Sequence, residues 1–70
     1  MSSKLWFISE DDTPIAVFDS KRQAVEEYRS YMNDDEESEY HLYSLPFEEF
    51  EHSPDEHEEE YNLAMEEGLI

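Results

Sequence analysis

The sequence predicts a small α+β domain in which a three-stranded antiparallel sheet packs against one helix and is followed by a second, acidic helix. Three observations predict it: two short apolar runs near the N-terminus, a helical apolar stripe after them, and an alternating stretch in the middle of the chain. The expected order is β-β-α-β-α. With 70 residues, one domain is expected (1–70), divided into a β-β-α-β core (1–50) and an acidic C-terminal helix (51–70).

The first two elements are expected to form a β-hairpin. Residues 5–8 and 15–18 are apolar runs rich in strand-forming side chains, and about five polar residues separate them. Residues 10–13 form a polar turn, and Pro14 fixes the backbone after it. Apolar side chains are consecutive at residues 6–8 rather than alternating. This run indicates either that both faces of the sheet are covered or that one face is an interface.

The third element is expected to be an amphipathic helix over about residues 21–32. Ser20, followed three residues later by Gln23, is a capping-box pattern at its start. The apolar side chains that share one face of this helix are Ala24, Tyr28 and Tyr31. This stripe is expected to lie on the hairpin. The basic residues Lys21 and Arg22 oppose the helix dipole, which suggests that they pair with nearby acids.

The next segment is expected to be an acidic loop followed by the third strand. Residues 33–38 are polar, and residues 39–45 alternate in the manner of a strand. Pro46 ends that strand. Phe47 and Phe50 enclose two glutamates, which fits one turn of helix held by two aromatic side chains.

The last element is expected to be a helix from Pro54 to about Glu67. Ser53 is a candidate N-cap, Pro54 suits the first helical position, and Glu56 completes a capping box. Gly68 is a candidate for the residue just after the helix, where a positive φ is common.

The charge of the chain is its strongest functional signal. The net charge is −17, all four basic residues lie within the first 29 positions, and residues 33–70 hold 15 acidic residues and no lysine or arginine. Self-repulsion destabilises a compact state, so a surplus of this size indicates a role outside the fold. Duplex DNA carries one charge per about 1.7 Å, so 17 charges match roughly 29 Å of duplex. Imitation of DNA is therefore the leading hypothesis, and binding to nucleic acid or to a membrane is not expected.

Other classes of function find little support in the sequence. There is no cysteine, and no apolar run reaches the ~18 residues that span a membrane. Residues 33–37 lack the spacing and the glycine of a calcium loop. His41, His52 and His57 form no zinc motif, so no specific metal site is expected. Without a nucleophile motif or a cofactor fingerprint, no enzyme activity and no cofactor are expected.

The aromatic content favours self-association. Ten aromatic side chains in 70 residues exceed what so small a core readily holds. Aromatic residues are enriched at protein interfaces. A homodimer with two-fold symmetry is therefore expected.

The whole-chain pattern resembles the small acidic DNA-mimic proteins of bacteriophages, which share a strategy rather than a motif. The resemblance lies in size, charge, the absence of cysteine and three acidic blocks at residues 34–39, 48–51 and 55–60. It implies an inhibitor that acts in the host cytoplasm on a basic DNA-binding protein. Within this group, the phage protein that blocks the nucleoid protein HU is most similar in size and in its dimeric state.

The predicted function is therefore competitive blocking of a host protein's DNA binding, with an HU-like nucleoid protein as the preferred target. One alternative is inhibition of a restriction, CRISPR or DNA-repair enzyme. Another is an acidic adaptor or transcription regulator that binds a surface unrelated to DNA, and a specific cation binder is a third. The acids expected to stand in for phosphates are Asp34, Asp35, Glu36, Glu37, Glu48, Glu49, Glu51, Asp55, Glu56, Glu58, Glu59 and Glu60.

Overall fold

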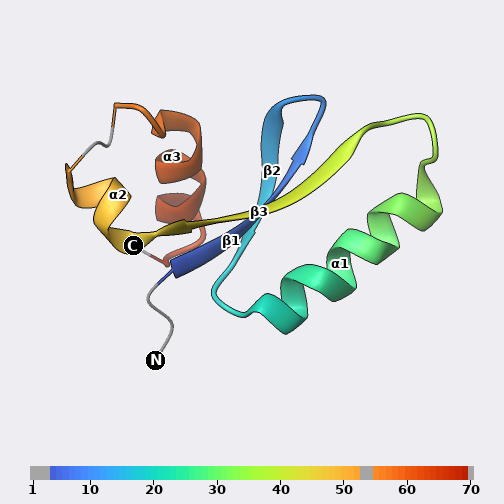
Figure 1. Cartoon of the computed structure of the whole chain (residues 1–70), viewed down its shortest axis with the longest axis horizontal. Coiled ribbons are helices and arrows are strands. Elements are labelled where there is room, and N and C mark those ends of the chain that lie inside the picture. Colours follow the sequence, from blue (N-terminus) through green and yellow to red (C-terminus); the bar gives the residue numbers. More distant parts are fainter. Residues whose placement is uncertain (1–3, 53–54, 70) are drawn as a thin grey trace.

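The computed structural model describes residues 4–52 and 55–69, and it gives the backbone alone at Glu51 and His52. The α+β class and the three-stranded antiparallel sheet are confirmed (Figure 1). The observed order is β-β-α-β-α-α, because the helical turn expected after the third strand is a helix of its own. The elements are β1 Lys4–Glu10, β2 Thr13–Phe18, α1 Lys21–Asp34, β3 Tyr40–Pro46, α2 Phe47–His52 and α3 Glu58–Glu66.

The sheet has the order β2-β1-β3, so the first strand is the central one and both of its pairings are antiparallel. Phe7 in β1 lies opposite Val17 in β2 and Tyr43 in β3. The register between β1 and β2 shifts after Ile8. Ile8 lies opposite Ala16, but Ser9 lies opposite Pro14, so β2 has one extra residue at this point. A proline is tolerated there because β2 is an edge strand.

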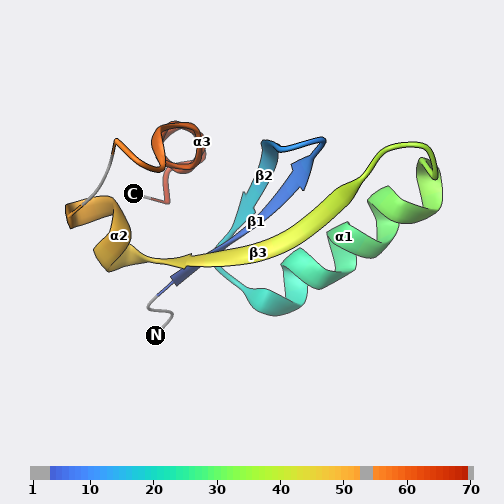
Figure 2. The ribbon, with the colours of Figure 1, turned by 45° about the horizontal axis from the view of Figure 1, so that its top comes forward.

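Helices cover both faces of the sheet, with α1 on one face and α2 and α3 on the other (Figure 2). Successive residues of a strand point to opposite faces. In β1, Leu5 and Phe7 join the core cluster that includes α2 and α3. Trp6 points the other way, and the Lys21 ammonium of α1 lies 5.6 Å from the centre of its ring. The consecutive apolar run in β1 is therefore explained by burial on both faces.

The larger core lies between the sheet and the two C-terminal helices. Its buried members are Leu5, Phe7, Val17, Phe50 and Ala64. The Phe7 ring stacks on Tyr43 with 5.6 Å between ring centroids and lies 6.1 Å from Phe50. Aromatic pairs of this kind add about 0.5–1.5 kcal/mol beyond the area that they bury. These contacts hold α2 and α3 against the sheet.

The face toward α1 has a smaller core. Ile8 and Ala24 are fully buried, and the rings of Tyr31 in α1 and Tyr40 in β3 stack with 5.4 Å between centroids. The Tyr28 hydroxyl donates a hydrogen bond to the Tyr40 carbonyl oxygen at 3.2 Å. The stripe of α1 therefore packs on the sheet, and it contacts β3 as well as the hairpin on which it was expected to lie.

The expected capping box at Ser20 is wrong, although the helix begins where it was expected. Ser20 is the N-cap residue, and its carbonyl accepts a hydrogen bond from the Ala24 amide at 3.1 Å, but its side chain makes no capping hydrogen bond. Packing anchors this end instead, since Ala24 is fully buried against the sheet. The helix also ends at Asp34, two residues later than expected, and Arg22 pairs with Glu26 at 3.6 Å.

The last helix begins later than expected, at Glu58 instead of Pro54. Ser53 and Pro54, on which the expectation rested, lie outside the described residues, and residues 55–57 form a turn. His57 is the residue before the helix, with a φ of −125° and a ψ of 44°. Its side chain contacts α2, where its ring lies 6.4 Å from that of Phe50 in an edge-on arrangement. The turn at residues 55–57 is thus packed against α2 through His57.

The C-terminal end of α3 matches the expectation for Gly68. This residue has a φ of 77°, which glycine adopts without strain. Its amide bonds the Met65 carbonyl at 3.1 Å, and the Leu69 amide bonds the Ala64 carbonyl at 2.9 Å. This pair of bonds is a Schellman motif. It returns Leu69 to the core.

Candidate acidic interaction surface

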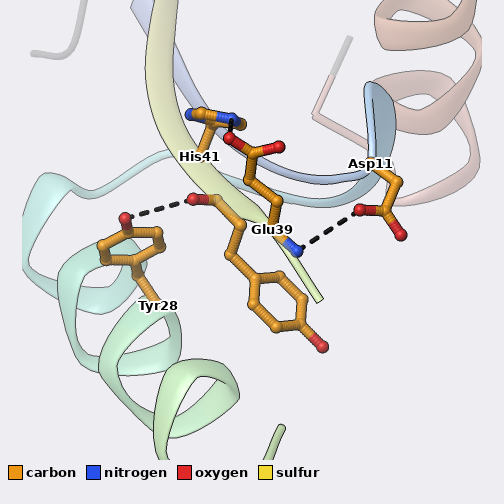
Figure 3. Close-up of polar contacts among 5 residues, drawn as sticks. Asp11, Tyr28, Glu39 and His41 are labelled. Atoms are coloured by element: carbon orange, nitrogen blue, oxygen red, sulfur yellow. Dashed lines mark hydrogen bonds and ion pairs between the residues drawn. The ribbon is translucent and has the colours of Figure 1, made fainter. Parts of the chain in front are cut away.

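The turn of the hairpin and the loop after α1 lie side by side and form one acidic group. The Asp11 amide donates to the Glu39 carbonyl at 3.0 Å, and the Glu39 amide donates to the Asp11 carboxylate at 3.3 Å (Figure 3). The Ser38 hydroxyl lies 3.4 Å from a Glu10 carboxylate oxygen. We call this group the tip cluster, and its acidic members are Glu10, Asp11, Asp12, Asp34, Asp35, Glu36, Glu37 and Glu39.

Asp35 organises the loop of the tip cluster. Its carboxylate accepts hydrogen bonds from the Ser38 hydroxyl at 2.8 Å and from the amides of Glu37 and Ser38 at 3.0 and 3.2 Å. The Ser38 hydroxyl bond, together with the amide bonds, lowers the pKa of Asp35 below its ordinary value of 3.8. The loop between α1 and β3 therefore holds a fixed shape, and Glu36 and Glu37 project from it as exposed side chains.

The start of β3, which follows the tip cluster, is held by contacts with α1. Figure 3 shows Tyr28 of α1 bonded to the carbonyl of the residue between Glu39 and His41. His41 Nε2 lies 3.4 Å from a Glu39 carboxylate oxygen. Burial, together with the charge of Glu10, raises the pKa of the Tyr40 hydroxyl above its ordinary value.

A second acidic group lies on α2, on the turn before α3 and on the first turn of α3. We call it the helical cluster, and its described acids are Glu48, Glu49, Asp55, Glu56, Glu58, Glu59 and Glu60. Glu60 accepts a hydrogen bond from the Tyr43 hydroxyl at 3.0 Å. Burial, together with the charge of Glu60, raises the pKa of Tyr43. Glu49 lies 3.3 Å from His57 Nε2.

The tip cluster and the part of the helical cluster just before α3 lie along one edge of the molecule, whereas α2 lies below that edge. In Figures 1 and 2 the turn between β1 and β2, the loop between α1 and β3, and the segment that leads into α3 all lie along the upper edge. The starts of β1 and α1, which carry Lys4, Lys21 and Arg22, lie below them. The molecule is 36 Å long, 25 Å wide and 17 Å thick. The acids therefore extend along its length.

The predicted acids differ in how free they are to meet a partner. Asp35, Glu49 and Glu60 are half-buried and already engaged within the chain, and the side chain of Glu51 lies outside the described residues. The other eight predicted acids are exposed: Asp34, Glu36, Glu37, Glu48, Asp55, Glu56, Glu58 and Glu59.

The sequence prediction missed the acids that the hairpin turn adds. Glu10, Asp11 and Asp12 precede the acidic loop by more than twenty residues, yet they lie against it because β1 pairs with β3. The pairing of Glu10 with Tyr40 fixes this contact. A prediction that the third strand pairs with the first would have found this contact.

No pocket opens among residues 4–52 and 55–69, so the candidate site is an open surface. Within the same ranges, no helix has both the length and the apolar character needed to cross a membrane. In comparisons with known proteins, no family model, no curated protein and no solved structure matches this chain.

Proposed function

We propose that this chain is a DNA mimic that binds a basic DNA-binding protein of a host cell and blocks its DNA binding. The observation that carries the proposal is the placement of acids from distant parts of the sequence along one edge of a 36 Å molecule. One turn of duplex DNA is about 34–36 Å long. A DNA-binding groove of the target that contacts one turn of duplex could therefore contact carboxylates of this chain over a similar length.

The chemistry of such binding is the pairing of carboxylates with side chains that otherwise hold phosphate oxygens. Arginine and lysine form charge-assisted hydrogen bonds with either group. Complementary charge over a broad face speeds association and makes the affinity fall with salt. An HU-like nucleoid protein is the preferred target, in the cytoplasm of a bacterial host, and this preference rests on the resemblance in size and charge described above.

The spread of the acids supports this proposal over an adaptor role. An adaptor interface has a compact centre with few charges, where a small number of side chains supply most of the binding energy. Here exposed acids occupy both the tip cluster and the helical cluster. Self-association remains part of the proposal, and half-exposed Met32 and Met65 are apolar side chains available to an interface.

The experiment is a competition titration with a fluorescent DNA duplex bound to an HU-like protein. The test variant carries Asp55→Asn, Glu56→Gln, Glu58→Gln and Glu59→Gln, which spares Glu60 and its bond to Tyr43. We expect this variant to displace the duplex at least tenfold less well than the natural chain. Each exposed pair contributes up to about 1 kcal/mol, so a single Glu→Gln change should cost less than that.

The matched control changes the same number of charges away from the proposed edge. It carries Glu26→Gln and Glu27→Gln on α1 and Glu66→Gln and Glu67→Gln at the end of α3, all of which are exposed. We expect the control to compete nearly as well as the natural chain. Equal losses in the two variants would mean that total charge, rather than the arrangement of the acids, governs binding.

A further inference from the structure

Three potential metal ligands meet where α2 approaches the start of α3. Glu49, Glu56 and His57 each offer one ligand atom, and these atoms all lie within 4.8 Å of one another. Glu49 comes from α2, whereas the other two come from the turn before α3. No zinc-ligand spacing is visible in the sequence here, because the site depends on a contact between α2 and the turn before α3.

From this geometry we propose that Glu49, Glu56 and His57 bind one zinc ion. Zinc is held at about 2.0–2.2 Å by imidazole nitrogen and carboxylate oxygen. In a tetrahedral site these bond lengths place neighbouring ligand atoms roughly 3.3–3.5 Å apart. Glu49 and His57 already have this spacing, with 3.3 Å between Oε2 and Nε2.

The imidazole is the ligand that is held in place. The His57 side chain is 23% exposed, and its ring packs edge-on against Phe50, which belongs to the core. Glu56 is exposed and can move the short distance that a bound ion requires. A preorganised imidazole lowers the cost of binding, because fewer side chains must be ordered.

The mixed ligand set selects the class of ion. Calcium and magnesium take oxygen ligands, whereas imidazole suits zinc and neighbouring transition metals. Three protein ligands leave a fourth position for water. A bound ion would connect α2 to the start of α3. The inference is independent of the proposed function, since it rests on these three side chains alone.

The test is a titration of the full chain with zinc chloride against a chromophoric chelator, at 0.15 M salt with millimolar magnesium to occupy diffuse acidic sites. We expect one zinc ion per chain. His57→Gln should weaken zinc binding at least tenfold and leave calcium binding unchanged. The matched control is His41→Gln, because His41 also contacts a glutamate, at 3.4 Å, but belongs to no three-ligand group among the described residues.

A second measurement uses nuclear magnetic resonance of the natural chain, so its result does not depend on whether a variant folds. Zinc should shift the ring signals of His57 and leave those of His41 in place. The proposal is overturned if His57→Gln binds zinc as tightly as the natural chain does. It is equally overturned if His41→Gln loses as much affinity, or if zinc shifts the ring signals of another histidine instead.

Discussion

At the scale of single residues, the acids serve two different purposes. Asp35 and Glu60 use their carboxylates inside the fold, where Ser38 and Tyr43 donate hydrogen bonds to them. Glu36 and Glu37 are exposed beside Asp35 and stay available to a partner. In the sequence, Asp35, Glu36 and Glu37 belong to one acidic run and cannot be told apart. The fold distinguishes them: Asp35 accepts the hydrogen bonds that hold the loop, whereas Glu36 and Glu37 are exposed to a partner.

Asp35→Asn should therefore lower the stability of the fold at neutral pH. The pKa of Asp35 is lower in the folded state than in the unfolded chain, so its ionised form stabilises the fold above the unfolded pKa of about 3.9. This contribution is lost as the pH falls through the lower folded pKa. Thermal unfolding temperatures of the variant and the natural chain should differ at pH 7 and converge as the pH falls below the lowered pKa of Asp35 in the folded chain.

The control for this prediction is Asp34→Asn, which removes the same charge from the exposed neighbour at the end of α1. Relief of repulsion should make this variant equal to the natural chain or slightly more stable. If Asp35→Asn follows the same course, the hydrogen bonds of Asp35 do not stabilise the loop.

At the scale of elements, apolar patterns predicted the strands and the first helix well, because burial decides these elements. The helix from Glu58 was misplaced at its start, since the contact of His57 with α2 is not visible in a local pattern. The hairpin turn was expected to be longer than it is. It contains only Asp11 and Asp12, whose φ angles are 50° and 72°.

Asp12→Gly should stabilise this turn. Two-residue hairpin turns with positive φ at both positions prefer glycine at the second, because glycine reaches this conformation without strain. We expect a gain of about 0.5–1 kcal/mol in the free energy of unfolding, measured by urea denaturation.

Asp12→Asn separates the effect of charge from the effect of the backbone. It removes the carboxylate from the tip cluster and keeps a side chain that tolerates positive φ. Asp12→Gly should be the more stable of the two variants. Because both variants lack the carboxylate, a less stable Asp12→Gly would mean that the positive φ at Asp12 carries no strain for glycine to relieve.

At the scale of the whole molecule, the sequence predicted the charge but not its distribution in space. The acidic surplus and its segregation from the basic residues were visible in the chain. The shared edge was not, because it needs the pairing of β1 with β3 to bring the hairpin turn to the loop after α1. It also needs the core around Phe7 and Phe50 to set α3 against the sheet. Tertiary contacts thus turn separate acidic runs into one surface.

If these acids stand in for DNA phosphates, this chain and duplex DNA must exclude each other on one target. A gel-shift titration would mix an HU-like protein, a labelled duplex and increasing amounts of this chain at low salt. We expect the chain to release the duplex completely, with no species that contains all three components. A complex of this chain, the target and the duplex that persists at saturation would contradict this expectation, because the two ligands would then occupy different surfaces.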